Sequence, residues 1–163
     1  MNIRNATMAD LDEVTRVESE CFPAAEAASR EELEQRLNAY PQHFWLLEDE
    51  GKLVAFVDGM TTDCDKLTDE MFADASLHNE YGAWQMIFGV NTVPEYRRRG
   101  CAAALLQCAI ATAAAQNRRG LVLTCMDELV HYYAKFGFVD EGISDSTHGG
   151  AVWHDMRLTF PKN

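Results

Sequence analysis

The chain has 163 residues, 47% hydrophobic and 25% charged, a balance typical of one globular domain that excludes a disordered or fibrous protein. Its 26 acidic and 14 basic residues give a net charge of -12, which disfavours binding to nucleic-acid phosphates and favours cationic amines, although solubility alone explains the acidity equally well. No apolar run approaches the roughly 20 residues of a membrane helix, and the first residues do not resemble a signal peptide. We therefore expect one cytoplasmic domain over residues 1–163 that binds neither nucleic acid nor a membrane.

The cysteines and histidines follow neither a disulfide pattern nor a metal-binding pattern. The five cysteines contain no CxxC pair and leave an odd one over, and the five histidines show no HExxH spacing. We expect reduced cysteines and no metal cofactor.

The first third of the chain predicts a strand and two capped helices. Residues 3–6 read as a short strand. Thr7 with Asp10 resembles a capping box for a helix that runs to about Cys21, and Ser29 with Glu32 forms a fuller box for a second helix. Residues 43–48 and 53–60 then predict two strands joined by a turn at 49–52.

The rest of the chain alternates between strands and helices. The polar stretch 61–82, with one helical turn near 68–72, is long for a connection and is therefore a candidate functional loop. Next come a central strand at 83–92, an Ala/Leu-rich helix at 101–116 and a buried strand at 121–124. Asp127 is expected to cap a helix that ends at Gly137. Closing strands are expected at 138–140 and 151–159. The pattern predicts an α/β (α+β) fold with a mixed, mostly antiparallel central sheet flanked by helices.

The clearest functional signal is a basic turn that opens the helix at 101–116. It reads Arg97, Arg98, Arg99, Gly100, Cys101, Ala102. Amides at a helix N-terminus lack partners within the helix, and the helix dipole adds positive potential. Small residues let a phosphate approach the backbone, so the turn predicts a pyrophosphate site. Without the Lys-Ser/Thr ending of a P-loop, nucleotide hydrolysis is not implied. The alternative is a solvated basic turn, which is harder to justify in a chain this acidic.

Two segments resemble GNAT-family N-acetyltransferases. Residues 90–102 (Val-Asn-Thr-Val-Pro-Glu-Tyr-Arg-Arg-Arg-Gly-Cys-Ala) are similar to that family's coenzyme-A-binding strand and its [R/Q]-x-x-G-x-[G/A] loop. Residues 132–138 (Tyr-Tyr-Ala-Lys-Phe-Gly-Phe) resemble its late Tyr-x-x-x-Gly-Phe segment. Within the family, residues 53–57 and 124–130 are similar to arylalkylamine N-acetyltransferases. The resemblance covers most of the chain and implies the GNAT fold, with a splayed central strand.

The resemblance implies direct transfer of an acetyl group from acetyl-CoA to an amine. Backbone groups of the central strand would hold the pantetheine and polarise the acetyl carbonyl, and the helix-opening turn would hold the pyrophosphate. The coenzyme-binding residues are then Val90, Asn91, Thr92, Arg97, Arg98, Arg99, Gly100, Cys101, Ala102 and Ala103. Tyr133 matches the tyrosine that protonates the leaving thiolate, and core packing is its alternative role. Tyr132 lies about 100° away around a helix and is expected to face elsewhere.

The resemblance also indicates a candidate for the general base that deprotonates the acceptor amine. Vertebrate arylalkylamine enzymes carry two histidines on the central strand, and Met86 and Phe88 stand at those places here. Glu26 resembles the glutamate of a Phe-x-x-x-Glu segment in some insect relatives, which makes it the candidate base, with an exposed surface role as its alternative. His78 and Glu80 are the next candidates.

The expected function is acyl-CoA-dependent N-acetylation of the primary amine of a small acceptor, an aromatic amine being one case, by a monomer or homodimer. Four apolar residues are candidates for the acceptor pocket: Phe22, Trp84, Met86 and Phe88. Two alternatives stay open, a protein or peptide N-acetyltransferase and a non-catalytic CoA-binding sensor module. A covalent route through Cys101 or Cys125 is a minor alternative, because the family transfers directly.

Overall fold

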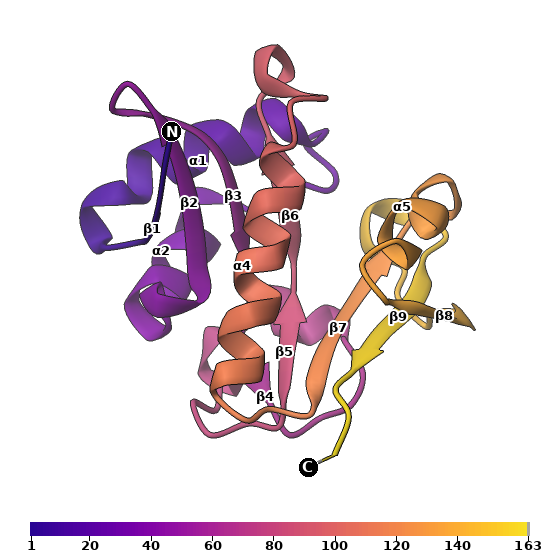
Figure 1. The fold of residues 1–163 in the computed structure, drawn as a ribbon. Coiled ribbons are helices and arrows are strands. Elements are labelled where there is room, and N and C mark those ends of the chain that lie inside the picture. The colour runs from indigo at the N-terminus through magenta and orange to yellow at the C-terminus, as the bar shows by residue number, and fades with distance from the viewer. Residues whose placement is uncertain (163) are drawn as a thin grey trace.

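The computed structural model describes residues 1–162, which form helices around two β-sheets (Figure 1). The helices are α1 (Leu11–Cys21), α2 (Arg30–Ala39), α3 (Asp69–Ala73), α4 (Cys101–Ala115) and α5 (Val130–Ala134). The strands are β1 (Asn2–Asn5), β2 (Phe44–Asp49), β3 (Lys52–Asp58), β4 (Thr61–Thr62), β5 (Trp84–Ile87), β6 (Gly89–Thr92), β7 (Gly120–Cys125), β8 (Val139–Ile143) and β9 (His154–Thr159).

The strands form two sheets that share the helix α4. The first sheet has the order β1-β2-β3-β6 and is antiparallel. The second has the order β4-β5-β7-β9-β8 and is parallel only between β5 and β7. Helix α4 packs against β2, β3, β6 and β7, whereas α1 packs against β3, β6 and α2. Figure 1 shows α4 in front of the strands, with α1 and α2 beside and behind the first sheet. The expected mixed, mostly antiparallel fold is confirmed, although as two sheets.

The central strand expected at residues 83–92 is interrupted at Phe88 and contributes to both sheets. Up to Ile87, β5 pairs with β7. From Gly89 onward, β6 pairs with β3 instead, and it is the last strand of the first sheet. Within residues 1–162, the far edge of β6 therefore has no strand partner, and the sheets separate from this point. This separation is the expected splay.

Two capping boxes form at the places the sequence predicts. Thr7 caps a 3-10 turn (Met8–Asp10) that leads into α1, and Ser29 caps α2. The amide of Thr7 donates to Asp10 Oδ2 at 2.8 Å, and the amide of Ala9 donates to Thr7 Oγ1 at 3.3 Å. In the second box the amide of Ser29 donates to Glu32 Oε1 at 3.0 Å, and the amide of Glu32 donates to Ser29 Oγ at 3.1 Å. Loss of such a cap typically costs ~1 kcal/mol, so these residues position the segment between the two helices.

Two boundaries near the C-terminus differ from the prediction. Asp127 does not cap a helix: it is the first residue of a 3-10 turn (Asp127–Leu129), and α5 begins only at Val130. Its carboxylate instead lies 3.2 Å from His154 Nε2. The last strand begins at His154 rather than at residue 151, because a 3-10 turn with two positive-φ glycines occupies residues 148–150.

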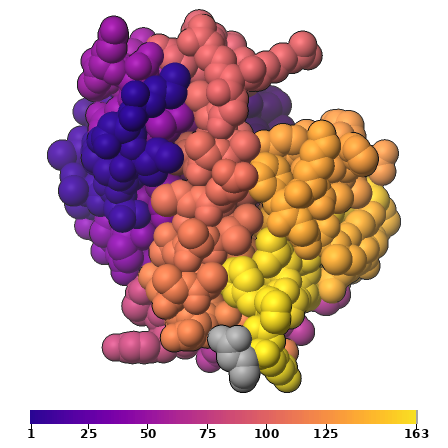
Figure 2. Space-filling view, in the orientation of Figure 1, coloured from indigo at the N-terminus to yellow at the C-terminus, as the bar shows by residue number. Residues whose placement is uncertain are grey.

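Helix α4 also separates the two halves of the chain on the molecular surface. Figure 2 shows it between the indigo and magenta N-terminal part and the orange and yellow C-terminal part. Within residues 1–162, no helix combines the length and the apolar character that crossing a membrane requires.

Candidate active site

A cavity of about 130 Å³ lies where the two sheets separate. The break at Phe88 contributes residues 87–90, and β7 contributes residues 123–125 at the point where β5 no longer pairs with it. The remaining lining comes from both halves of the chain and consists of Glu18, Phe22, Glu26, Ala28, Glu32, Arg36, Asp58, Phe72, Leu129, Tyr133, His148 and Trp153. The cavity is thus formed by segments that meet only in the folded chain.

Tyr133 lines the cavity from α5 and is 7% exposed. Burial, with a smaller contribution from Cys125, raises the pKa of its phenol well above the ordinary 10. The hydroxyl therefore keeps its proton at physiological pH and can act as a donor. Tyr132 is half-buried, meets Tyr133 edge-on with ring centroids 5.2 Å apart, and does not belong to the cavity lining.

Neither cysteine of the covalent alternative has the environment of a nucleophile. Cys125 lines the cavity, but burial raises the pKa of its thiol to about 12, so it is protonated at neutral pH. Cys101 is buried at the start of α4 and does not belong to the cavity lining.

The turn that opens α4 is exposed and contains two residues with positive φ. Arg98 and Gly100 both have positive φ, at 62° and 80°, and Gly100 is the N-cap of α4. Arg97 Nε donates to the carbonyl of Thr92 at 3.1 Å, and Arg99 stacks on Tyr96 at 4.7 Å. These contacts fix the turn to the end of β6, while all three arginines remain exposed.

Coenzyme A fits this arrangement. The first amides of α4 have no partner within the helix, and a Cβ added at Gly100 would meet no atom within 4 Å, so the turn is open to a phosphate. The adjoining edge of β6 offers unpaired backbone groups to an extended chain such as pantetheine. Of the predicted residues Val90, Asn91 and Thr92, only Val90 lines the cavity, whereas the other two are buried.

Glu26 lies at the cavity beside a loop from the far end of the chain. Its carbonyl accepts a hydrogen bond from His148 Nε2 at 2.8 Å, and its Cγ is 2.6 Å from the position a Cβ on Gly149 would take. His148 stacks on Phe72 at 5.1 Å, and its carbonyl accepts from Trp153 Nε1 at 2.9 Å. The cavity wall therefore combines the α1–α2 connection, α3 and residues 148–153.

Several predicted residues lie elsewhere. Phe22 and Phe88 line the cavity, but Trp84 and Met86 do not. Trp84 lies outside the cavity because it belongs to the part of β5 that still pairs with β7. Its ring instead contacts two guanidinium groups, Arg119 at 5.2 Å and Arg157 at 4.7 Å from the ring centroid.

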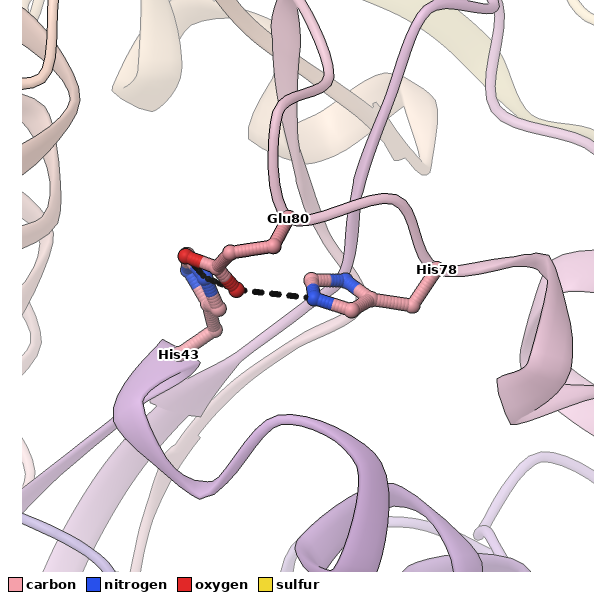
Figure 3. A group of neighbouring side chains, drawn as sticks. All are labelled: His43, His78 and Glu80. Carbon is pink, nitrogen blue, oxygen red and sulfur yellow. Dashed lines mark hydrogen bonds and ion pairs between the residues drawn. The ribbon is translucent and has the colours of Figure 1, made fainter.

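The two reserve candidates for the base, His78 and Glu80, also lie outside the cavity lining and form a separate cluster with His43 (Figure 3). Glu80 Oε1 lies 2.9 Å from His78 Nε2 and 3.0 Å from His43 Nε2. His78 Nδ1 accepts from the amide of Thr61 at 3.1 Å, so a neutral His78 carries its proton on Nε2. That nitrogen has no lone pair for a metal, and Arg118 adds positive charge 3.5 Å from Glu80. The cluster therefore anchors the 61–82 segment to the strands and is a poor metal site.

A buried ionic group on the cavity wall was not predicted from the sequence. Glu18 is 5% exposed, Arg36 3% and Asp58 0%. Arg36 Nη1 lies 3.1 Å from Asp58 Oδ2. Glu18 Oε2 accepts from the amide of Ala28 at 2.9 Å, and Glu18 Oε1 from Asn91 Nδ2 at 3.3 Å. Burial, reinforced by the Asp58 charge, raises the pKa of Glu18 from 4.5 to about 7. A signal was present, because Glu18 continues the helical spacing of Leu11, Val14 and Val17, all buried.

The raised pKa of Glu18 predicts a stability cost. The folded state binds the proton more tightly than the unfolded chain, so stability falls as pH rises from 4.5 to about 7. Glu18→Gln removes the titration, and we expect this variant to be more stable than the wild type at pH 8, by at most about 3 kcal/mol. Urea unfolding at pH 4 and pH 8 measures this difference. An equal stability difference at the two pH values would show that Glu18 does not titrate in this way.

Comparisons with known proteins agree with this geometry. The pattern of the Acetyltransferase (GNAT) family matches residues 11–138. A serotonin N-acetyltransferase from Mesocricetus auratus is 30% identical over 113 residues, which are 69% of this chain and 53% of that protein. The chain thus matches about half the length of this relative.

Two solved structures share the fold. The loading GNATL domain of CurA from Lyngbya majuscula has a TM-score of 0.83 at 18% identity, with 97% of this chain and 96% of that chain covered. The GphF GNAT-like decarboxylase, solved in complex with isobutyryl-CoA, has a TM-score of 0.83 at 22% identity, with 98% and 99% covered. Since the family pattern spans most of the chain and the two sheets separate around a cavity, the chain belongs to the GNAT acetyltransferase family.

Proposed function

We propose that this chain transfers the acetyl group of acetyl-CoA to the primary amine of a small acceptor. The observation that carries the proposal is the cavity at the sheet separation, which brings the protonated phenol of Tyr133 together with a group of carboxylates. A proton donor for the leaving thiolate and anionic groups for a cationic acceptor are the two requirements of this reaction.

The coenzyme would bind along the free edge of β6, with its pyrophosphate over residues 98–103. Backbone groups of β6 near Val90 would orient the thioester and polarise its carbonyl. The amine nitrogen attacks the carbonyl carbon directly, and the C–S bond breaks. Tyr133 supplies the proton that turns the departing thiolate into a thiol.

The charges of the cavity favour a cationic acceptor. Its lining contains four carboxylates, Glu18, Glu26, Glu32 and Asp58, against one arginine. The Arg36 charge is already paired with Asp58, so it is not free to bind a carboxylated acyl group. Four aromatic side chains, Phe22, Phe72, Phe88 and Trp153, complete the wall and suit an ammonium attached to an apolar body.

A panel of acceptors tests this proposal. Acetyl-CoA is supplied with 2-phenylethylamine, with butylamine and with a lysine-rich peptide, and the released thiol is measured. We expect the highest kcat/KM for 2-phenylethylamine, because it combines an ammonium with an aromatic body. A preference for the peptide would support protein acetylation instead, and coenzyme binding without thiol release would support a sensor module.

Glu26 is proposed to hold the incoming ammonium at the cavity. Glu26→Gln should then raise KM for the charged amine several-fold at neutral pH while kcat changes little, because the loss affects binding rather than the transition state. Steady-state kinetics from pH 6 to 10 measures both parameters, and Glu31→Gln on the exposed face of α2 is the matched control.

A different pH profile would assign Glu26 a different role. If Glu26 is the base, kcat/KM falls near neutrality and partly recovers at high pH, where the amine is already neutral. If the wild-type and Glu26→Gln profiles superimpose, the residue takes no part in catalysis.

A further inference from the structure

Four buried polar residues meet at the cavity. Glu18 from α1, Arg36 from α2 and Asp58 from β3 line it, and Asn91 from β6 contacts Glu18 without lining it. Arg36 contacts Asp58 at 3.1 Å and donates to the carbonyl of Phe72 at 2.8 Å. Its guanidinium lies 4.9 Å from the ring centroid of Phe88. The group is therefore fixed directly beside the break in the central strand.

The hydrogen bonds in this group are incomplete. Among residues 1–162, Arg36 Nε and Asn91 Oδ1 have no hydrogen-bond partner although both atoms are buried, and the Asp58 carboxylate has only the Gly89 amide beside its contact with Arg36. Unpaired buried polar atoms are costly and rare in folded proteins. Glu18, Arg36 and Asp58 line the cavity, so this incompletely hydrogen-bonded group borders the space that a substrate can enter.

The charges in the group are also unbalanced. Two carboxylates face one guanidinium, and the guanidinium is in contact with Asp58. Glu18 accepts only from an amide and from Asn91, so it has no cation as a hydrogen-bonding partner. An ammonium in the cavity would supply that missing positive charge.

We propose that Glu18 is the proton acceptor for the substrate ammonium, an inference that rests on the proposed acetyltransferase function. An N–H bond of the ammonium breaks, and its proton moves to a carboxylate oxygen of Glu18. The neutral amine then attacks the thioester. The second amine proton is lost as the amide forms and restores the phenol of Tyr133, which has given its own proton to the thiolate. The proton held by Glu18 leaves to solvent, so the whole reaction releases one proton.

The surroundings of Glu18 suit this role. Asp58 raises its pKa, Arg36 and the two hydrogen-bond donors lower it, and Cys21 is the neighbouring titratable group on the same helix. With a pKa of about 7, Glu18 accepts a proton from an alkylammonium of pKa ~10 with an equilibrium penalty of about 10³-fold. A carboxylate with a pKa of 4.5 would face an equilibrium penalty of more than 10⁵-fold. The buried position of Glu18 therefore favours proton transfer from the ammonium.

The test is Glu18→Gln, compared with Glu20→Gln on the exposed side of the same helix. The glutamine oxygen can still accept from the Ala28 amide. Its NH₂ takes the place of the oxygen that faces Asn91 Nδ2, and it can donate to Asn91 once that side-chain amide turns over and presents its unpartnered Oδ1, so the fold is expected to survive. At pH 7 we expect kcat/KM for 2-phenylethylamine to fall by about 10²–10⁴-fold. In the wild type, the plot of kcat/KM against pH should fall on the acidic side of about pH 7. This acidic limb should disappear in Glu18→Gln, while the affinity for acetyl-CoA stays unchanged.

A second acceptor separates proton transfer from packing. An aromatic amine with a pKa below 7, such as aniline, is already neutral at pH 7, so the difference between wild type and Glu18→Gln should shrink at least ten-fold. A deficit of equal size for both amines would overturn the proposal, as would a wild-type pH profile in the variant. If Glu18→Gln does not fold, Glu18→Asp replaces it and should shift the acidic limb. Failure of the wild type to acetylate any amine would refute the proposed function instead.

Discussion

Tyr133→Phe is expected to lower kcat by about 10²–10⁴-fold while the affinity for acetyl-CoA changes less than about two-fold. The substitution removes only the hydroxyl, and the ring still fills its place in the cavity wall. Since the pKa of Tyr133 is raised by burial, the wild-type hydroxyl remains a donor across the whole physiological range. Without it, the thiolate must leave unprotonated or take its proton from water.

The matched control is Tyr132→Phe, which removes the hydroxyl from the adjacent, half-buried tyrosine. It should keep wild-type turnover. Stopped assays with titration of the free thiol give kcat, and calorimetry gives the coenzyme affinity. Wild-type turnover in Tyr133→Phe would assign the proton to solvent or to another residue, and an equal loss in both variants would indicate disturbed packing of α5.

Gly100→Leu is expected to abolish acetyl-CoA binding while the protein stays folded. Gly100 has φ of 80°, a conformation that costs a residue with a side chain ~1–2 kcal/mol. Apart from the adjoining backbone, no atom of residues 1–162 lies within 4 Å of the new Cβ, so the first atom of the side chain is accommodated. Its side chain would instead project into the space where the pyrophosphate must approach the first amides of α4.

Gly51 offers a closely matched control. It has φ of 78°, and a Cβ there also meets nothing within 4 Å, but it lies in the turn between β2 and β3. Gly51→Leu should therefore show the same small loss of stability with normal coenzyme binding by calorimetry. If Gly100→Leu binds acetyl-CoA as well as Gly51→Leu does, the pyrophosphate site lies elsewhere.

Local patterns in the sequence predicted most of the fold because the interactions involved are local. The two capping boxes at Thr7 and Ser29 each depend on residues three positions apart. The turn at Arg97–Gly100 is likewise specified by its own glycine and by the helix that follows. Asp127 was misassigned because aspartate suits both a cap and the first turn of a helix, and only the ion pair with His154 distinguishes the two.

The chemistry of the cavity could not be predicted in the same way because it depends on distant contacts. Glu18 and Asp58 are 40 positions apart, and the pKa of Glu18 depends on their joint burial. His148 reaches Glu26 across 122 positions, and nothing local marks either residue. Met86 and Phe88 occupy alternate positions of the broken strand, yet only Phe88, at the break itself, lines the cavity.

The central claim is tested most directly by analysing the products of one reaction. Wild-type protein is incubated with acetyl-CoA and 2-phenylethylamine, and the free thiol and the acetylated amine are quantified together by mass spectrometry. We predict N-acetyl-2-phenylethylamine and coenzyme A in equal amounts, with thiol release that depends on the amine. Coenzyme A released at the same rate without the amine, or bound acetyl-CoA that stays intact with every amine of the panel, would contradict the assignment of this cavity to amine acetylation.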